Sequence, residues 1–414
     1  MSTHTTEAQM FSYRTVTEVK DWGAVITKVI VDLGESVPNG AVTADTFAVR
    51  VTRIDSRLSD PLVEKGERRV IRAYVSDQDG NLVDRDDRYA AIELEIGPTA
   101  SLGSAIHYNG ATGFNAWNEN RYEIIQTKAI TTTDGTISNL TFNVLAGDIK
   151  TLVDDFDTGE FTHDNVALTY AEYSPAQGGH KKPLLIWLHG YGEGGTDPTI
   201  PIAANKAVSF ASEPMQAFFG GAYVLAPQSP TFWMDGHTRS GDGTSKYQQA
   251  LMALIQQYVA RHPGIDERRI YIGGCSNGGY MTMLMIRDYV GYFAAAFPVC
   301  EALEDTLVTD EDIRSMKDLP IWFVTAQADP VLPPDRFTVP TYKRLLQAGA
   351  QDVHLTLYDT VVDTTGLYHN SDGTPYEYHG HFSWVYVFNN EVRNTIDGRP
   401  TTLMEWLASR VRVS

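Results

Sequence analysis

Hydrophobic and polar residues alternate with a period of two through the first third of the chain. The alternation is clearest in three segments, where the apolar positions are Phe47, Val49 and Val51; Ile92, Leu94 and Ile96; and Leu140, Phe142 and Val144. This period is typical of strands with one buried and one solvated face. Turn sequences separate the segments, at Pro38-Asn-Gly40, Asp79-Gly-Asn81 and Asp134-Gly135. Because helical periodicity is missing here, the pattern predicts an all-β immunoglobulin-like sandwich over residues 1–147.

The pattern changes after an acidic stretch between Gly147 and Glu160, and we place a domain boundary at residue 148. The stretch lacks the alternating ligands of a calcium loop, so we interpret it as a solvated edge. Strands and helices then alternate. The predicted strands are 166–173, 183–188, 222–226, 269–273, 293–299, 321–325 and 353–358, and the predicted helices are 247–261, the segment after Ser276, 342–347 and the segment from 402. Continuous apolar strands of this kind predict a mainly parallel sheet with helices on both faces, over residues 148–414.

Composition and net charge limit the kinds of binding partner that we expect. The 414 residues carry 33 Lys and Arg against 52 Asp and Glu, a net charge of −19, which argues against nucleic acid and anionic membrane as partners. No apolar run approaches the roughly 20 residues that span a bilayer. The polar residues 1–7 lack the layout of a signal peptide, so we expect a cytoplasmic protein, or a secreted one whose leader preceded this numbering.

The two cysteines, Cys275 and Cys300, match no metal-ligand spacing, and we expect neither a metal nor a cofactor. Two readings of the pair stay open. They are either free, buried thiols or one local disulfide, since both residues end predicted neighbouring strands.

A candidate nucleophile lies between the predicted strand 269–273 and the next helix. Gly274, Ser276 and Gly278 fit the pattern G-x-S-x-G, in which a sharp turn lifts the serine hydroxyl above the sheet. The pattern is short and occurs by chance, so it needs support from the rest of the chain.

That support comes from the carboxyl ends of the other predicted strands, where active sites of parallel sheets lie. Asp329 follows the strand 321–325 and is the candidate acid, and His381 is the candidate base, with His379 as a competitor. The order serine, acid, histidine is that of an α/β-hydrolase triad. The glycine-rich segment after His189 suggests an oxyanion hole built from the backbone N–H groups of Tyr191 and Asn277.

With these features the chain resembles serine esterases of the α/β-hydrolase superfamily, in particular two-domain bacterial esterases with an N-terminal immunoglobulin-like domain, related to the polyhydroxybutyrate-depolymerase and feruloyl-esterase group. The resemblance rests on residues 187–195, 226–233, 266–279, 329–333 and 381–384. It implies a carboxylesterase that acts on a small or polymer-attached ester through an acyl-enzyme. In one departure, Glu301 follows the strand 293–299 where such esterases have glycine, which makes it a candidate for the site rim and a minor alternative to Asp329 as the acid.

Specificity is less constrained by the sequence. Trp233 and Trp384 are candidate pocket walls, and for Trp384 core packing is an equal alternative. We expect the loops 231–246 and 363–379 to set the pocket depth. Two rival functions are a peptidase of the prolyl-oligopeptidase type, whose propeller repeats are not visible here, and a binding protein that has kept the fold.

The N-terminal domain has its own alternatives. We expect it to be structural or to form homo-oligomers, while a carbohydrate-binding role would use Tyr108, Phe114, Trp117 and Tyr122.

Overall fold

The computed structural model describes residues 11–57, 61–176, 178–236 and 241–412, so the polar segment 1–7 and residues 237–240 of the predicted specificity loop lie outside the described residues. The chain divides into an N-terminal unit, residues 1–107 with 116–154, and a C-terminal unit, residues 108–115 with 155–414. The predicted boundary at residue 148 falls inside a strand, β12 (Thr141–Lys150). The division lies later because Gly147 to Lys150 still pair with Arg14 to Thr17.

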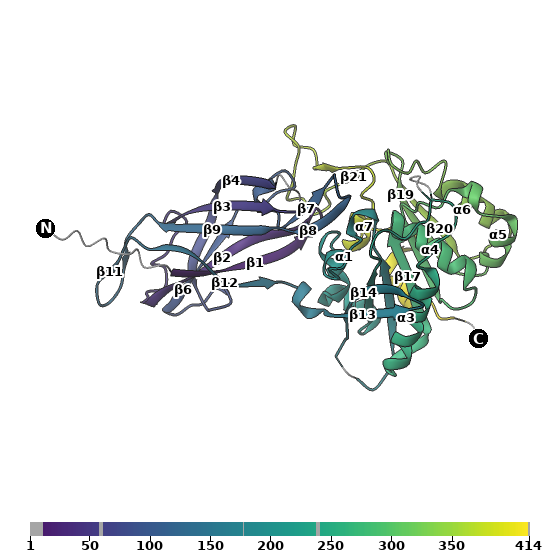
Figure 1. Ribbon diagram of the computed structural model, residues 1–414, viewed down its shortest axis with the longest axis horizontal. Helices are drawn as coiled ribbons and strands as arrows, with labels where there is room; N and C mark the ends of the chain where they lie inside the picture. Colours follow the sequence, from purple (N-terminus) through teal and green to yellow (C-terminus); the bar gives the residue numbers. More distant parts are fainter. Residues whose placement is uncertain (1–10, 58–60, 177, 237–240, 413–414) are drawn as a thin grey trace. The chain divides into compact units, whose positions relative to one another are not determined.

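One eight-stranded sheet forms the body of the N-terminal unit, in the order β4-β3-β9-β12-β1-β2-β6-β5 (Figure 1). Its neighbouring strands pair antiparallel except for β1 and β12, which are parallel in the described part of the chain. The bounds of these strands are Phe11–Lys20 (β1), Gly23–Val37 (β2), Phe47–Asp55 (β3), Leu62–Arg68 (β4), Val70–Ser76 (β5), Asp87–Leu94 (β6) and Glu119–Gln126 (β9), and a small hairpin joins Ile130–Thr131 (β10) to Thr136–Ile137 (β11).

The sheet folds back over its own core. Arg68 of β4 donates to the hydroxyl of Tyr122 in β9 and to the carbonyl of Ile26 in β2, although β4 and β2 are far apart in the strand order. Phe47 and Phe142 pack edge to face in the core of this unit. The predicted alternation holds in β3, whose Phe47, Val49 and Val51 are buried.

The alternation fails at Val144, which is 41% exposed although it was predicted to face inward. The reason is an irregularity in the pairing of β1 with β12, where the register shifts twice between Phe11 and Arg14. Each shift changes which side chains face the core.

The C-terminal unit is built on a second eight-stranded sheet, in the order β13-β14-β16-β15-β17-β18-β19-β20. The strands from β16 to β20 run parallel, and β13 and β14 form an antiparallel edge, so the predicted mainly parallel sheet is confirmed. The bounds are Asp157–His163 (β13), Val166–Tyr173 (β14), Lys182–Leu188 (β15), Tyr223–Gln228 (β16), Ile265–Cys275 (β17), Ala295–Val299 (β18), Ile321–Ala326 (β19) and Val353–Tyr358 (β20).

Both faces of this sheet are covered, as continuous apolar strands require. In β15, Leu184, Ile186 and Leu188 join the core shared with α3 (Gln248–Arg261) and α4 (Asn277–Asp288). Trp187 packs on the other face of the sheet, against Phe210 and Phe388. The helices are Ile200–Ala203 (α1), Glu213–Phe219 (α2), Gln248–Arg261 (α3), Asn277–Asp288 (α4), Asp310–Met316 (α5), Thr338–Gln347 (α6), Trp384–Phe388 (α7) and Leu403–Ser409 (α8).

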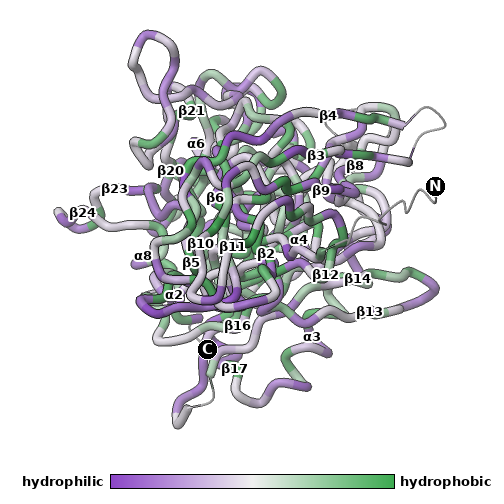
Figure 2. Tube along the Cα trace, turned by 90° about the vertical axis from the view of Figure 1, so that its left-hand side faces the viewer, coloured by the Kyte–Doolittle hydropathy of each residue, from purple (hydrophilic) through white to green (hydrophobic). Residues whose placement is uncertain are grey.

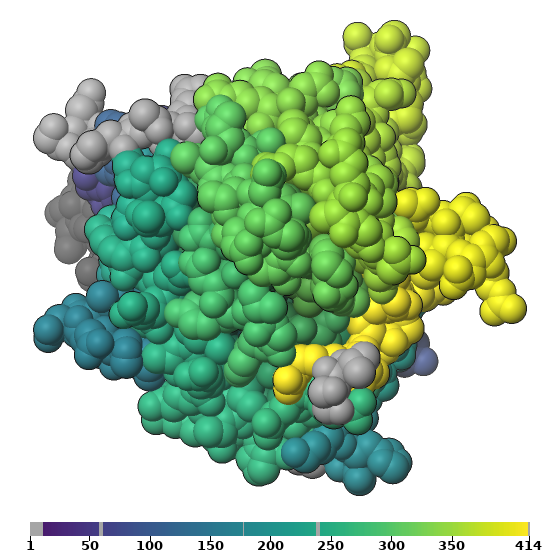
Figure 3. All heavy atoms as spheres, turned by 90° about the vertical axis from the view of Figure 1, so that its right-hand side faces the viewer, coloured from purple at the N-terminus to yellow at the C-terminus, as the bar shows by residue number. Residues whose placement is uncertain are grey.

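The C-terminal unit also contains short β-hairpins. Val361–Val362 (β21) pairs with Glu377–Tyr378 (β22), and Arg393–Ile396 (β23) pairs with Arg399–Thr402 (β24). The β23–β24 hairpin is hydrophilic in Figure 2 and projects as yellow atoms in Figure 3. Among the described residues, no helix is long and apolar enough to cross a membrane.

Candidate active site

Ser276 occupies a sharp turn between β17 and α4. Its backbone has φ 54° and ψ −114°, a conformation that residues with a Cβ rarely adopt and that costs on the order of 1–3 kcal/mol. The N–H of Ser276 donates to the carbonyl of Val299 in β18 at 2.9 Å, which ties the turn to the next strand. The strain is therefore held by the surrounding sheet, as expected of a nucleophile elbow.

The two flanking glycines are required by close backbone contacts. A Cβ on Gly274 would lie 2.6 Å from the carbonyl oxygen of Leu188, and a Cβ on Gly278 would lie 1.9 Å from the same atom. The elbow thus packs directly on the end of β15. This close approach is the physical reason for the G-x-S-x-G pattern at these positions.

An acid and a base meet at the ends of two other segments. Nδ1 of His381 lies 2.8 Å from Oδ2 of Asp329, whose side chain is fully buried. The other carboxylate oxygen of Asp329 accepts from the N–H groups of Val331 and Leu332. These bonds fix the carboxylate so that Nδ1 carries the histidine proton and Nε2 is left as the acceptor.

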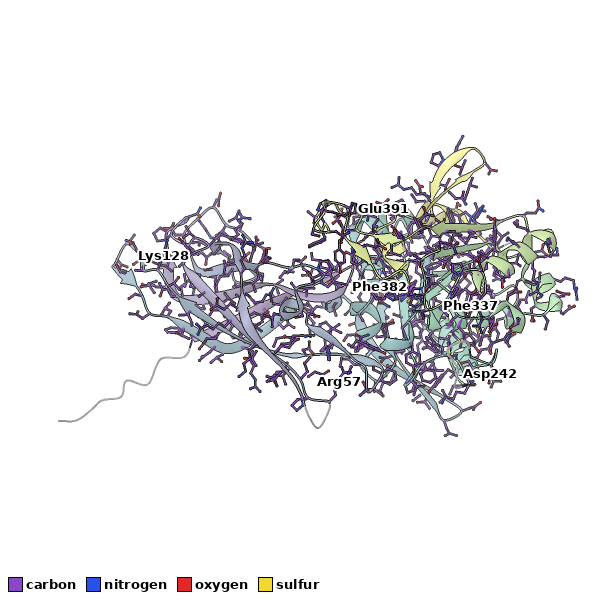
Figure 4. The ribbon with its side chains drawn as sticks, turned by 90° about the horizontal axis from the view of Figure 1, so that it is seen from above. Arg57, Lys128, Asp242, Phe337, Phe382 and Glu391 are labelled. Carbon is purple, nitrogen blue, oxygen red and sulfur yellow. The ribbon has the colours of Figure 1, made fainter. Side chains whose placement is uncertain are left out.

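His379, the competing candidate for the base, has different contacts. His379 is exposed, and its Nδ1 accepts from the backbone N–H of His381 at 3.3 Å. Its ring packs against Phe382, one of the residues labelled in Figure 4. Asp329 pairs with His381 instead. The geometry therefore favours His381 as the base.

The strand order brings the ends of β17, β18 and β19 side by side, so Ser276, Cys300 and Asp329 follow three neighbouring strands. Burial raises the pKa of the Cys300 thiol well above its usual value, and the charge of Asp329 raises it further. Cys275 and Cys300 are both buried and free, so of the two readings the pair of free thiols is confirmed and the local disulfide is wrong.

The loop after β15 carries the other predicted elements of the site. A short helical turn, Tyr191–Glu193, follows Gly190, and the backbone N–H groups of Tyr191 and Asn277 have no hydrogen-bond acceptor among the residues that the structure describes. Free N–H groups of this kind can bind a developing oxyanion.

The histidine at the start of this loop is a structural residue. His189 is fully buried, and its Nε2 accepts from the N–H of Ser229 at 3.1 Å. Burial lowers the pKa of His189 to about 4, so the ring is neutral near pH 7.

Trp233 does not fit its predicted role as an open pocket wall, because its side chain is 0% exposed. The backbone N–H of Trp233 donates to Oδ1 of Asn277 at 2.5 Å. Its indole Nε1 donates to the carbonyl of His189 at 3.2 Å. Trp233 instead links the elbow to the loop after β15.

The other two candidate substrate contacts differ from each other. Trp384 packs edge to face on His381 with ring centroids 5.5 Å apart, and its role as a pocket wall stays a prediction. Glu301 is only 1% exposed and accepts from the N–H of Leu303, so it does not reach an open rim. Burial raises the pKa of Glu301 to about 8, and Asp329, not Glu301, holds the histidine.

Residues 108–115, the tip of the hairpin between Ile106–Asn109 (β7) and Phe114–Trp117 (β8), belong to the C-terminal unit. The ring of Tyr191, 44% exposed, stacks between Phe114 and Phe232, with centroids 6.4 and 4.7 Å away. Nδ2 of Asn115 donates to the carbonyl of Gly192 at 3.0 Å. Phe114 thus packs beside the candidate site, while Tyr122, another candidate for sugar stacking, is core.

Comparisons with known proteins found two matching families and a similar solved structure. Residues 12–139 match the family described as "Esterase Ig-like N-terminal domain", and residues 233–328 match the "Prolyl oligopeptidase family". The structure described as "Crystal Structure of a Thermostable Esterase" is 25% identical, with a TM-score of 0.78, and the similarity covers 97% of this chain and 100% of that one. The matches support a serine hydrolase of the esterase type. They also confirm the predicted α/β-hydrolase fold preceded by an immunoglobulin-like domain.

Two further solved structures are similar to parts of this hydrolase. The acylaminoacyl peptidase of Pyrococcus horikoshii is 14% identical, with a TM-score of 0.36, over 65% of this chain and 47% of that one. A ferulic acid esterase is 16% identical, with a TM-score of 0.39, over 49% of this chain and 89% of that one. No curated protein matches the hydrolase in sequence.

Several residues around the site of the hydrolase escaped the sequence reasoning, namely Asn115, Glu193, Asn205 and Gly380. One signal was present, since Glu193 stands three residues after Gly190, the spacing at which a carboxylate reaches back to cap a helical turn. Asn115 and Asn205 carried no such signal, because their contacts depend on tertiary packing.

Proposed function

We propose that this hydrolase is a serine carboxylesterase whose triad is Ser276, His381 and Asp329. The observation that carries the proposal is the buried 2.8 Å bond between His381 and Asp329, in a sheet whose neighbouring strand ends present Ser276 on a strained turn. The expected substrates are short-chain or aryl esters of the feruloyl type, either as small molecules or attached to a polymer.

In the first half of the reaction, Oγ of Ser276 attacks the ester carbonyl while Nε2 of His381 accepts the hydroxyl proton. Asp329 holds the imidazole in the required tautomer and stabilises the imidazolium that forms. The N–H groups of Asn277 and Tyr191 stabilise the oxyanion, and one such donor is typically worth roughly 3 kcal/mol of the barrier. His381 then protonates the leaving alcohol as the ester C–O bond breaks.

In the second half, water replaces the alcohol. His381 accepts a proton from this water, whose oxygen attacks the acyl carbon of the ester now formed with Ser276. The same N–H groups receive the second oxyanion. The proton on His381 returns to Oγ as the bond to the acyl group breaks, and the carboxylic acid leaves.

A peptidase of the prolyl-oligopeptidase type is the second candidate, because residues 233–328 match that family. The N-terminal match to an esterase domain over residues 12–139 supports ester over amide hydrolysis. Matched p-nitrophenyl esters and p-nitroanilides of the same acyl group distinguish the two candidates. We expect rapid ester cleavage and little anilide cleavage, and the reverse preference would favour the peptidase.

The test of the proposal uses purified Ser276→Ala on a panel of p-nitrophenyl acyl esters and methyl ferulate. Loss of the serine in comparable triads lowers turnover by a factor of about 10⁶. A variant that retained most of its activity would refute the assignment. A wild-type chain that cleaved no ester on the panel and reacted with no fluorophosphonate would indicate the third candidate, a binding protein.

A further inference from the structure

Glu193 is a buried carboxylate of the site that the reaction above does not use. The residue is 6% exposed, and its Oε2 accepts from the N–H of Gly190 at 2.7 Å and from Nδ2 of Asn205 at 3.0 Å. Burial raises the pKa of Glu193 to about 7, and these two hydrogen bonds oppose the rise. Burying a carboxyl group is costly unless hydrogen bonds compensate for the lost water, and Gly190 and Asn205 supply such bonds to Glu193.

The bonds of Glu193 connect the two segments that supply the proposed oxyanion donors. Gly190 directly precedes Tyr191 in the loop after β15. Nδ2 of Asn205 also lies 3.4 Å from Sγ of Cys275, the residue before Ser276. Through Asn205, the carboxylate therefore spans from the loop to the elbow.

Two further side-chain amides, of Asn115 and Gln228, also contact this turn. Nδ2 of Asn115 donates to the carbonyl of Gly192 at 3.0 Å and approaches Oε1 of Glu193 at 3.5 Å. Nε2 of Gln228 donates to the carbonyl of Glu193 at 2.9 Å. Side-chain amides from three separate segments thus converge on one short turn.

We propose that Glu193 is a positioning residue for the reaction, whose carboxylate holds the loop after β15 at the distance from the elbow that the oxyanion requires. The side-chain amides of Asn205 and Asn115 in turn contact this carboxylate. The inference rests on the proposed function, since it concerns the geometry of the two N–H donors. Such donors act only when they lie about 2.7–3.1 Å from the oxyanion, and small misplacements cost orders of magnitude in rate.

The decisive variant is Glu193→Gln, which keeps the size and burial of the side chain. An amide has one oxygen and one NH2 group. With its oxygen toward Gly190 and Asn205, the variant turns its NH2 group toward Nδ2 of Asn115. In the reverse orientation, the NH2 group faces the donors of Gly190 and Asn205. We expect kcat for a p-nitrophenyl ester to fall at least tenfold while KM changes less than about threefold.

A second readout separates positioning from general damage. A trifluoromethyl ketone binds as a tetrahedral oxyanion, so its Ki should rise by the same factor as kcat/KM falls. A matched control is Glu172→Gln on β14, at a carboxylate that is 20% exposed and pairs with His262. We expect this control to keep kcat and Ki within twofold of the wild type.

Asn115→Ala is the second variant, for the case in which Glu193→Gln does not fold. It removes a partly exposed side chain, and we expect a smaller loss of kcat, about threefold to tenfold, with the same parallel rise in Ki. The inference is overturned if folded Glu193→Gln has wild-type kcat, or if it loses kcat without a rise in Ki. It is also overturned if neither Glu193→Gln nor Asn115→Ala differs from Glu172→Gln in kcat and Ki. If the wild-type chain is not labelled by a fluorophosphonate, the proposed function fails first and the inference falls with it.

Discussion

Gly380 lies where the segment that carries the base touches the segment that carries the acid. A Cβ at this position would lie 2.2 Å from the carbonyl oxygen of Ala328 and 3.1 Å from the nitrogen of Asp329. Both contacts are to backbone, so a neighbour cannot yield by a change of rotamer. The absence of a side chain at Gly380 is what lets His381 approach Asp329 at hydrogen-bond distance.

We expect Gly380→Ala to lower kcat at least tenfold, because the two backbones must separate and the bond between His381 and Asp329 lengthens. The measurement is steady-state hydrolysis of a p-nitrophenyl ester. Gly179→Ala is the control, since a Cβ there meets nothing within 4 Å. Equal kcat for both variants would show that the contact at Gly380 is not needed.

Glu193 also predicts how stability depends on pH. Burial raises its pKa from the ordinary value of 4.5 to about 7. The folded state therefore binds this proton more tightly than the unfolded state, so the stability that Glu193 contributes is fully present below pH 4.5 and is lost as the pH rises through 7. Each pKa unit corresponds to about 1.4 kcal/mol.

Glu193→Gln has no such ionisation. The difference in Tm between Glu193→Gln and the wild type should thus shift in favour of the variant between pH 5 and pH 8. Thermal unfolding in buffers of matched ionic strength measures this shift. A difference in Tm that stays constant from pH 5 to pH 8 would contradict the prediction.

At the scale of elements, the sequence predicts what local pattern determines. The continuous apolar strands β15, β17 and β19 lie in the interior of the sheet and were predicted. The edge strand β13 begins in the acidic stretch, for which the sequence predicted only a solvated edge. Ser276, Asp329 and His381 were found because a motif and a chain order mark them. For Glu193 the sequence carried one local signal, its spacing from Gly190, but its contacts with Asn115 and Asn205 depend on tertiary packing and could not be predicted.

Two buried tryptophans offer a matched test of the link between loop and elbow. Trp233 and Trp187 are both 0% exposed, but Nε1 of Trp233 donates to the carbonyl of His189, whereas Nε1 of Trp187 has no partner among the described residues. Substitution by Phe removes similar volume at both sites. We expect Trp233→Phe to lower the free energy of unfolding by about 1 kcal/mol more than Trp187→Phe.

Urea unfolding measures both variants. The larger cost at Trp233 has two sources, the lost hydrogen bond and the carbonyl of His189 left without that donor. A larger loss for Trp187→Phe would contradict the role of Trp233 as the link.

At the scale of the molecule, the C-terminal unit is discontinuous in sequence, since residues 108–115 belong to it. A fragment of residues 155–414 lacks Phe114 and Asn115, and with them one ring of the stack on Tyr191 and the bond to Gly192. We expect this fragment to have a lower kcat than the full chain. Equal kcat for the folded fragment and the full chain would show that the hairpin tip is dispensable.

The central claim is that Ser276 is the nucleophile, and it is tested most directly by intact-protein and peptide mass spectrometry after reaction with a fluorophosphonate. The account predicts one adduct per chain, located on Ser276, and no adduct on Ser276→Ala. Label on another residue, or an unchanged extent of labelling in Ser276→Ala, would contradict it.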